Sequence, residues 1–171
     1  MAQPHGKVQT IMKKVAIIMG SKSDADVVKK AVDRLNEWGV TYKTRVLSAH
    51  RTPDEVAEFA RGAQSEEYGV IIAAAGKAAA LPGCVAAYTT LPVIGLPIQS
   101  SFMDGLDSLL SIAQMPPGIP VATVGTNAAE NAAILAVQIL GVADSDAREI
   151  IVQHKQSMRE RILEDDKNFS F

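Results

Sequence analysis

Hydrophobic residues follow two alternating patterns along this chain of 171 residues. In the first pattern, apolar residues run almost without interruption and end near glycine, serine or proline, which is typical of strands buried in a parallel sheet. In the second, apolar residues recur every three or four positions, which predicts amphipathic helices. The predicted strands cover 13–21, 41–49, 68–76 and 91–100, and a fifth lies within 116–126. The predicted helices cover 23–40, 52–63, 78–90, 105–115 and 128–140. Five strands that alternate with helices predict an α/β fold with a doubly wound, five-stranded parallel sheet.

A long additional helix is predicted near the C-terminus, over residues 144–166. One face carries the apolar stripe Ala147, Ile150, Ile151, His154, Met158 and Ile162, and the other face is charged. The stripe must be buried, either by folding back on the chain's own sheet or by docking on a neighbouring subunit, and the second alternative implies a homo-oligomer. We expect residues 1–12 to form a disordered tail and residues 13–171 to form a single catalytic domain that includes this helix.

Composition and charge narrow the class of protein. The net charge of -2 gives no basic field of the kind that nucleic-acid binding needs. No apolar run is long enough to span a membrane, and the first residues have no apolar core typical of a secretory signal. Cys84 is the single cysteine, so a disulfide framework is impossible and a cytoplasmic protein is expected. Cysteine, histidine and acidic residues do not cluster at the spacing of metal ligands, so no metal is expected.

Polar residues follow the predicted strands at their carboxyl ends, which is where open parallel sheets bind ligands. The five segments are "GSKSD" at 20–24, "SAHRT" at 48–52, "AAAGKAAA" at 73–80, "PIQSS" at 97–101 and "VGTN" at 124–127. Because all five strand ends meet at one edge of the sheet, we expect these segments to share a crevice.

The segment "GSKSD" combines a glycine turn, two serines and a carboxylate at the start of a helix. Backbone N–H groups and the hydroxyls of Ser21 and Ser23 suit a phosphate, and Gly20 lets the backbone approach it. Asp24 is suited to accept hydrogen bonds from ribose hydroxyls. The structural alternative is that Ser23 or Asp24 simply caps the helix.

The segment "SAHRTPDE" predicts a helix start that does not require His50 or Arg51. Thr52 to Glu55 match a capping box with Pro53 at the first helical position. His50 and Arg51 are therefore left on the loop with Ser48 and Ala49, facing the crevice. Arg51 offers a two-pronged donor for a phosphate, and His50 can carry a proton near neutral pH. The alternative is a loop histidine that bonds to the backbone.

The segment "AAGKAAALPG" at 74–83 is made mostly of small residues. The alanines favour close packing of helix on sheet, and Gly76 also lets a flat ligand approach the backbone. Lys77 is either a solvated surface lysine or a cation that faces a carboxylate or carbon dioxide. With Ala78, Ala80 and Leu81, these two residues complete the candidate substrate site.

Several segments together resemble one enzyme family. "MGSKSD", "SAHRTPD", "ALPGCVAA", "LPVIGLPIQS", "GLDSLLSIAQMPPGIPVATV" and "NAAILAVQIL" occur in order between about residues 13 and 141. They are similar to the catalytic subunit of the purine-biosynthesis carboxylase, the family of the N5-carboxyaminoimidazole ribonucleotide mutase, often called PurE.

The resemblance implies a flavodoxin-like three-layer αβα fold and a cytoplasmic homo-octamer with active sites between subunits. It implies an aminoimidazole ribonucleotide as substrate, carbon dioxide as the transferred group, and no metal, biotin or ATP as cofactor. The mutase moves a carboxylate from the exocyclic nitrogen to ring carbon four. By position, Ser21, Ser23 and Asp24 match the family's phosphate and ribose contacts, Ser48 and Arg51 match further phosphate ligands, and His50 matches the general acid–base.

One segment departs from the mutase pattern. The mutases typically have GAGGAAHLPG where this chain has "AAGKAAALPG", so Lys77 replaces a glycine and Ala80 a histidine. A related branch that carboxylates 5-aminoimidazole ribonucleotide directly also lacks that histidine and carries a basic residue near Lys77. However, that branch usually has LSG and often SAHKT, whereas this chain has "LPG" and "SAHRT". The mutase is therefore the leading interpretation. The direct carboxylase is the alternative, and a non-catalytic nucleotide-binding relative is the third.

Overall fold

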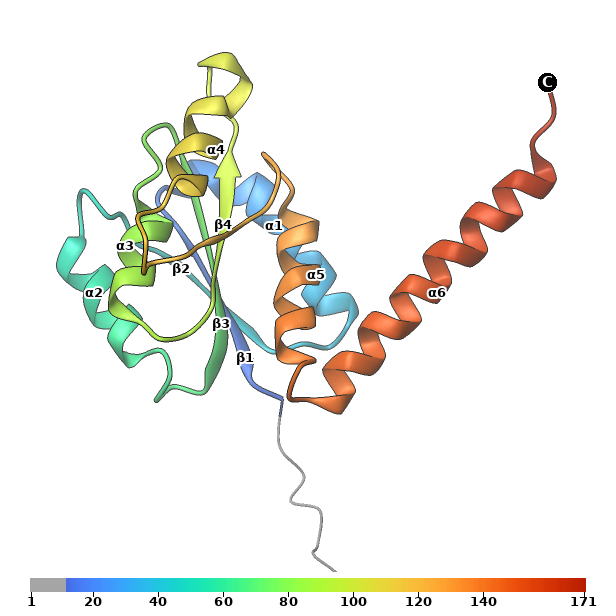
Figure 1. The fold of residues 1–171 in the computed structure, drawn as a ribbon, viewed down its shortest axis with the longest axis horizontal. Helices are drawn as coiled ribbons and strands as arrows, with labels where there is room; N and C mark the ends of the chain where they lie inside the picture. The colour runs from blue at the N-terminus through green and yellow to red at the C-terminus, as the bar shows by residue number, and fades with distance from the viewer. Residues whose placement is uncertain (1–11) are drawn as a thin grey trace, which may run out of the picture.

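Five parallel strands form one sheet in the order β2-β1-β3-β4-β5 (Figure 1). The structure is a computed structural model that describes residues 12–171. The strands are β1 Lys14–Met19, β2 Tyr42–Val46, β3 Tyr68–Gly76, β4 Val93–Ile98 and β5 Ala122–Thr123. From β1 the chain first moves outward to β2 and then returns past β1 to β3. The carboxyl ends of β1 and β3 therefore form the point where the winding direction reverses, the usual ligand-binding position in this fold.

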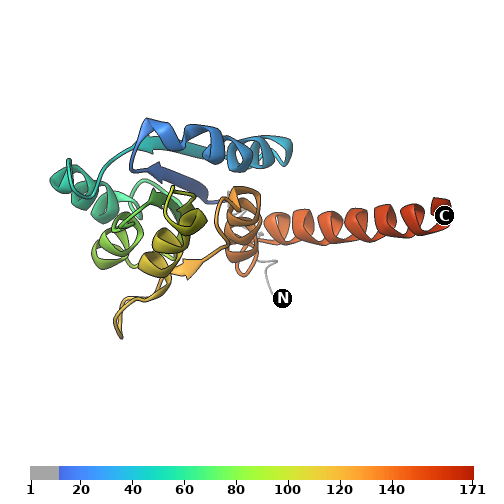
Figure 2. The ribbon, with the colours of Figure 1, turned by 90° about the horizontal axis from the view of Figure 1, so that it is seen from above.

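Helices cover both faces of the sheet and make three layers, which confirms the predicted flavodoxin-like αβα fold (Figures 1 and 2). The helices are α1 Ala25–Glu37, α2 Pro53–Gly62, α3 Leu81–Tyr88, α4 Leu106–Ala113, α5 Ala129–Leu140 and α6 Ser145–Asn168. Side chains alternate between the faces along each strand. Val15 and Ile17 join the core beneath α1 and α5, whereas Ala16 and Ile18 join the core beneath α2 and α3.

The predicted elements all form, although their lengths differ from expectation. β3 has the predicted bounds, and β1 and β4 lie inside the predicted runs. β5 lies within the predicted segment 116–126 but has only two residues, because the segment 116–120 is rich in proline and glycine, which limit ladder pairing. Gly39 adopts φ +64° two residues after the end of α1, a left-handed conformation typical of a glycine that ends a helix.

Glycine at one position in β4 sets how closely a helix approaches the sheet. A Cβ atom on Gly95 would lie 2.2 Å from Ile112 Cγ2 in α4 and 2.9 Å from Val121 Cγ1. Side chains at this distance must move, so only glycine lets α4 pack directly on the centre of β4. α4 in turn supports the segment that follows β4.

The C-terminal helix α6 points away from the three-layer body (Figures 1 and 2). Ala147 and Ile151 of the predicted stripe are buried near α5, but Met158 and Ile162 further along it are 44% and 66% exposed. The helix therefore does not fold back over its own sheet, which removes one of the two alternatives for burying the stripe. The tail expected over residues 1–12 lies outside the described residues, except for Met12, which packs against the core.

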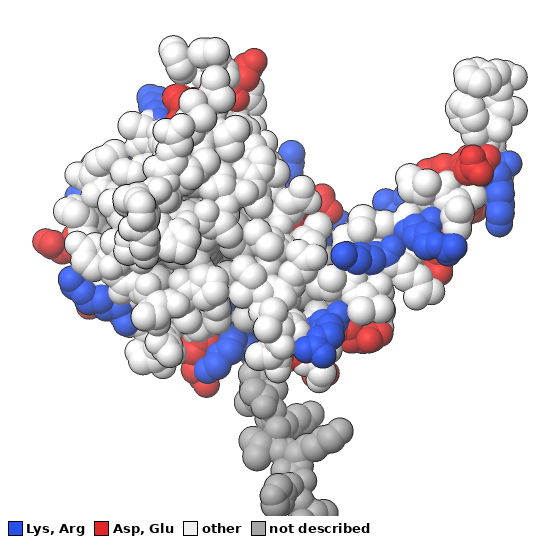
Figure 3. Space-filling view, in the orientation of Figure 1, with Lys and Arg blue, Asp and Glu red and all other residues white. Residues whose placement is uncertain are grey.

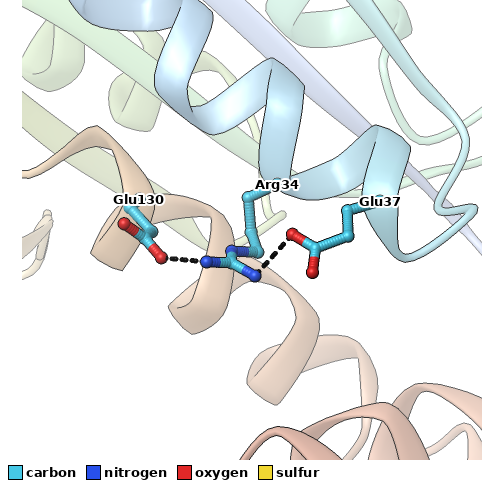
Figure 4. A network of polar contacts seen from close by, with 3 residues as sticks. All are labelled: Arg34, Glu37 and Glu130. Atoms are coloured by element: carbon cyan, nitrogen blue, oxygen red, sulfur yellow. Dashed lines mark hydrogen bonds and ion pairs between the residues drawn. The ribbon is translucent and has the colours of Figure 1, made fainter.

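An arginine links α1 to α5 close to the start of this projecting helix. Arg34 donates to Glu37 at 2.6 Å and also pairs with Glu130 of α5 (Figure 4). The Arg34 guanidinium stacks over Trp38, whose ring meets the imidazole of His154 edge-on at 5.1 Å between centroids. These contacts join α1, α5 and the first half of α6 into one layer.

Charged side chains of both signs are interspersed on the face shown in Figure 3, most densely along α6. Within residues 12–171, no helix combines the length and the apolar character that crossing a membrane requires.

Candidate active site

A cavity of about 550 Å³ opens at the carboxyl ends of the strands. Its volume lies in the range usual for small-molecule sites. Every residue predicted for the substrate site lines it, namely Gly20, Ser21, Ser23, Asp24, Ser48, Ala49, His50, Arg51, Gly76, Lys77, Ala78, Ala80 and Leu81. These residues come from three separate segments, and the fold brings them together as the strand-end argument predicted.

The turn after β1 presents two hydroxyls to the cavity. Ser21 caps the short helical turn Lys22–Asp24, and its Oγ accepts from the backbone N–H of Ser23 at 3.2 Å. The Ser23 hydroxyl lies 2.8 Å from Ser21 Oγ and 3.2 Å from Asp24 Oδ1. The cap is therefore Ser21, and the alternative that Ser23 or Asp24 is a simple helix cap is wrong. The Ser23 hydroxyl has one proton to share between these oxygens, so an incoming phosphate can readily rearrange this pair.

Asp24 is the carboxylate among the residues that line the cavity, and only 8% of its surface is exposed. Burial raises the pKa of its carboxyl above the ordinary value, and hydrogen bonds with the Ser23 side chain and the Ser21 backbone partly oppose the rise. A desolvated carboxylate gains from hydrogen-bond donors that a ligand brings. The position therefore suits contact with ligand hydroxyls, as predicted for a ribose.

The turn after β2 is locked by Thr52. Its hydroxyl donates to Ser48 O at 3.1 Å and accepts from Ser48 N–H at 2.9 Å, while the Thr52 N–H donates to Ser48 O at 2.8 Å. The predicted capping box is therefore wrong, because the Thr52 hydroxyl closes the Ser48–Thr52 turn instead of capping α2. Pro53 does stand at the first helical position as predicted. The hydroxyl thus fixes the loop that carries the histidine rather than the helix that follows it.

His50 and Arg51 project from this locked turn. Arg51 Nη2 donates to Gly20 O at 2.9 Å, and its Nε lies 3.3 Å from Ser48 Oγ. The guanidinium thereby connects the turn after β2 to the turn after β1. Its remaining N–H groups are available to a ligand. His50 is exposed at the cavity, where its imidazole can exchange protons with a bound molecule.

The third wall consists of small residues after β3. Ala75, Gly76, Ala78, Ala79, Ala80 and Leu81 line the cavity and make this side mainly apolar. Lys77 adopts a left-handed conformation, with φ +56°, and its side chain is exposed. A left-handed backbone is unfavourable for a residue with a Cβ atom, and such strain often marks functional positions. Gly76 is not required by packing, since a Cβ atom there would come no closer than 3.4 Å to Ile98 O.

A fourth wall was not among the predicted site residues. Ile98, the last residue of β4, and Gln99, Ser100 and Ser101 directly after it also line the cavity. The signal was present in the sequence, because "PIQSS" places polar residues directly after a buried strand. The expectation for the fifth strand was wrong: among the described residues, none from the "VGTN" segment lines the cavity. Asn127 of that segment instead contacts Gln99 from outside.

Serine hydroxyls, an arginine and backbone N–H groups gather at the ends of β1 and β2, which is the chemistry that binds phosphate. A histidine stands beside them, and an apolar wall faces them. The fold and the site together define a doubly wound α/β protein with a cavity suited to a phosphorylated small molecule.

Comparison with known proteins agrees with this class. The model of the AIR carboxylase family matches residues 14–161. The chain is 52% identical to the N5-carboxyaminoimidazole ribonucleotide mutase of Pyrococcus abyssi, over 89% of this chain and 87% of that protein. It is 50% identical to the enzyme of the same name from Thermotoga maritima, over 90% of each. The crystal structure of Treponema denticola PurE superposes with a TM-score of 0.84 at 30% identity, over 92% of this chain and 98% of that one. The chain therefore belongs to the AIR carboxylase family, as its sequence motifs predicted.

Proposed function

We propose that this protein is an N5-carboxyaminoimidazole ribonucleotide mutase of purine biosynthesis. The observation that carries the proposal is the meeting of His50, Arg51 and the two serines of the first turn in one cavity, in a chain about half identical to mutases. The enzyme would convert N5-carboxyaminoimidazole ribonucleotide to 4-carboxy-5-aminoimidazole ribonucleotide.

In this mechanism His50 carries one proton in each direction. Protonated His50 gives its proton to the exocyclic nitrogen as the nitrogen–carboxylate bond breaks, which releases carbon dioxide and leaves an electron-rich ring. Ring carbon four then attacks carbon dioxide and forms the new carbon–carbon bond. Neutral His50 removes the proton left on that carbon, so the histidine ends in its starting state. No net proton, electron or cofactor is consumed.

The remaining walls hold the reactants in place. Ser21, Ser23, Ser48 and Arg51 bind the phosphate, and Asp24 accepts hydrogen bonds from the ribose. The small residues after β3 enclose carbon dioxide, which keeps the second step effectively unimolecular. Lys77 stands at the rim of this wall, where its charge attracts the carboxylate.

Direct carboxylation of 5-aminoimidazole ribonucleotide is the second candidate, and Lys77 with Ala80 is the feature that favours it. The phosphoribosylaminoimidazole carboxylase of Vigna aconitifolia is 48% identical to this chain, although the match covers only 28% of that longer protein. The names of the full-length relatives favour the mutase.

A paired assay without ATP tests the two candidates. One reaction contains the N5-carboxylated ribonucleotide at low bicarbonate, and the other contains 5-aminoimidazole ribonucleotide with saturating carbon dioxide. Rapid conversion in the first reaction is the result expected for a mutase. Conversion only in the second would assign the protein to direct carboxylation, and conversion in neither would leave the binding of the ribonucleotide as its function.

We also propose that the protein is a homo-oligomer, held together in part by α6. It is either an octamer or an assembly of fewer subunits that uses the same contacts. The exposed apolar side chains of this helix and of its C-terminal end are Val152, Met158, Ile162, Leu163, Phe169 and Phe171. A second copy of the chain is the simplest partner, because apolar surface on a projecting helix is stabilised by burial.

Light scattering of a charged variant tests this role. The double substitution Met158→Glu and Ile162→Glu is expected to reduce the molar mass in solution, whereas Glu164→Lys on the charged part of the helix leaves it unchanged. An unchanged mass for the double variant would remove α6 from the interface.

A further inference from the structure

The wall after β4 is supported by an asparagine that does not itself line the cavity. Asn127 follows β5 and makes three hydrogen bonds with the end of β4. Its backbone N–H donates to Pro97 O at 2.8 Å, its Oδ1 accepts from the Gln99 N–H at 2.9 Å, and its Nδ2 donates to Gln99 Oε1 at 3.0 Å. Asn127 adopts φ +56°, a conformation that asparagine tolerates better than most residues. The side chain thus holds both the backbone and the amide of Gln99.

The hydrogen bonds made by the Asn127 side chain determine the orientation of the Gln99 amide. Because Oε1 accepts from Asn127, the Nε2 group is left with two protons to donate. One of them is directed at Asp104 Oδ1, at the long distance of 3.4 Å. The other remains free for a ligand, and Gln99 lies at the cavity. Gln99 is thereby prepared as a donor.

The backbone around Gln99 is held from a second side. The fully buried hydroxyl of Ser108, in α4, lies 2.9 Å from both Ile98 O and Gly105 O. Gly105 has φ +93°, and a Cβ atom there would come within 2.9 Å of Gln99 Cα. Contacts from α4 and from the residues after β5 therefore fix one residue of the cavity wall, which is the arrangement expected of a preorganised ligand contact.

The strand order places Gln99 across the cavity from the phosphate-binding side. Three strand spacings separate β2 from β4, or roughly 14 Å at about 4.8 Å per strand. A ribonucleotide whose phosphate lies at the ends of β1 and β2 would direct its other end toward β4. In the proposed reaction that end is the imidazole ring with its carboxylate, which accepts hydrogen bonds.

We propose that Gln99 donates a hydrogen bond from Nε2 to the carboxylate on the imidazole ring, and that Asn127 is the positioning residue that orients this amide. The inference deepens the proposed function and rests on it. It supplements the charge of Lys77 with a hydrogen bond from the β4 wall in the recognition of the carboxylate, separately from the phosphate contacts after β1 and β2.

The substitution Gln99→Glu tests the donor directly. Glutamate keeps the size of the side chain and an oxygen that accepts from Asn127, but it replaces the N–H donor with a negative charge. Calorimetry is expected to show a loss of about tenfold or more in affinity for 4-carboxy-5-aminoimidazole ribonucleotide. The affinity for 5-aminoimidazole ribonucleotide, which lacks the carboxylate, is expected to change by less than about threefold. Equal losses for the two ligands would overturn the assignment of Gln99.

Asn127→Gly tests the positioning role. Glycine accepts the left-handed backbone and keeps the backbone hydrogen bond to Pro97, so only the side-chain hydrogen bonds with Gln99 are lost. We expect kcat/KM to fall about tenfold in wild-type background but by less than about threefold in a Gln99→Ala background, because the two residues act together. Glu67→Gly, at another non-glycine residue with positive φ of 66° away from the cavity, is the matched control and should leave kcat/KM unchanged. Equal losses from Asn127→Gly in both backgrounds would overturn the positioning role.

Turnover by the wild-type chain distinguishes a failure of the Gln99 assignment from a failure of the proposed function. If it turns over the N5-carboxylated ribonucleotide but the Gln99 variant loses both ligands equally, only the inference fails. If the wild-type chain shows no turnover in the paired assay, the proposed function fails, and the assignment of Gln99 to the carboxylate fails with it.

Discussion

The two sides of the cavity are held by contacts that reach very different distances along the chain. On the side of β1 and β2, the turns are closed by neighbours: Ser21 bonds to Ser23, and Ser48 bonds to Thr52 four positions later. On the side of β4, Ile98 is held by Ser108 ten positions away, and Gln99 by Asn127 twenty-eight positions away. Each turn on the first side is therefore a local structure, and the Arg51–Gly20 hydrogen bond joins the two turns, whereas the second side exists only when α4 and β5 are in place.

This difference predicts two kinds of mutant. Substitutions on the β1 and β2 side should change ligand binding or chemistry and leave the fold intact. Substitutions on the β4 side should change stability and activity together, because the contacts that shape that wall are also contacts between elements of the fold.

His50→Asn is expected to have the largest effect and to leave the local side folded. Asparagine cannot shuttle a proton near neutral pH, so turnover should fall by about 10² to 10⁴. Affinity for the ribonucleotide and the melting temperature should stay close to those of the wild type. Stopped-flow turnover and calorimetry measure the two quantities, and near-normal turnover would exclude His50 as the proton carrier.

Gly105→Ala is expected to break the β4 side. The new Cβ atom would lie 2.9 Å from Gln99 Cα and from Thr126 Cγ2, in a backbone with φ +93°. Strain and overpacking together should lower the free energy of unfolding by about 2–4 kcal/mol and reduce activity as well. Gly118→Ala is the matched control, since Gly118 has φ +97° and open space around it. Urea denaturation of both variants isolates the packing contribution, and equal losses would show that Gly105 matters only for its backbone.

Arg51→Ala is expected to weaken binding without unfolding the protein. Loss of a charge-assisted contact should reduce the affinity for the phosphorylated substrate by roughly 10- to 100-fold. The affinity for the dephosphorylated nucleoside should change only a few-fold. Titration calorimetry with the two ligands measures the difference, and similar losses for both would remove Arg51 from the phosphate site.

Lys77→Gly is expected to have the smallest effect, and in the stabilising direction. Glycine relieves the left-handed backbone at φ +56°, which should raise the free energy of unfolding by about 0.5–1 kcal/mol. The lost charge should lower kcat/KM a few-fold in the paired assay. Glu67→Gly relieves a similar backbone outside the cavity and should gain stability without losing activity. A Lys77→Gly variant with full activity would make Lys77 a solvated surface residue.

Much of the fold could be predicted from the pattern of apolar residues. The runs that became β1, β3 and β4 are buried on both faces, so their sequences are continuously apolar and easily recognised. The short β5 was predicted only as a strand within 116–126, because the apolar residues there do not show how far the prolines and the glycine limit pairing. The predicted capping box at Thr52 was also wrong. The motif is compatible with either a helix cap or a closed turn, and the contact with Ser48 decided between them.

The sequence by itself determined the chemistry of the site on the side of β1 and β2, because each turn there carries its own polar residues next to a buried strand. Tertiary structure alone decided what supports the other side. That Asn127 reaches Gln99 instead of the cavity, and that Gly105 and Ser108 brace the same residue, depends on how α4 and the residues after β5 pack on β4. Hydrogen bonds between residues far apart in the chain leave no periodic or local pattern, so they become visible only when the sheet is assembled.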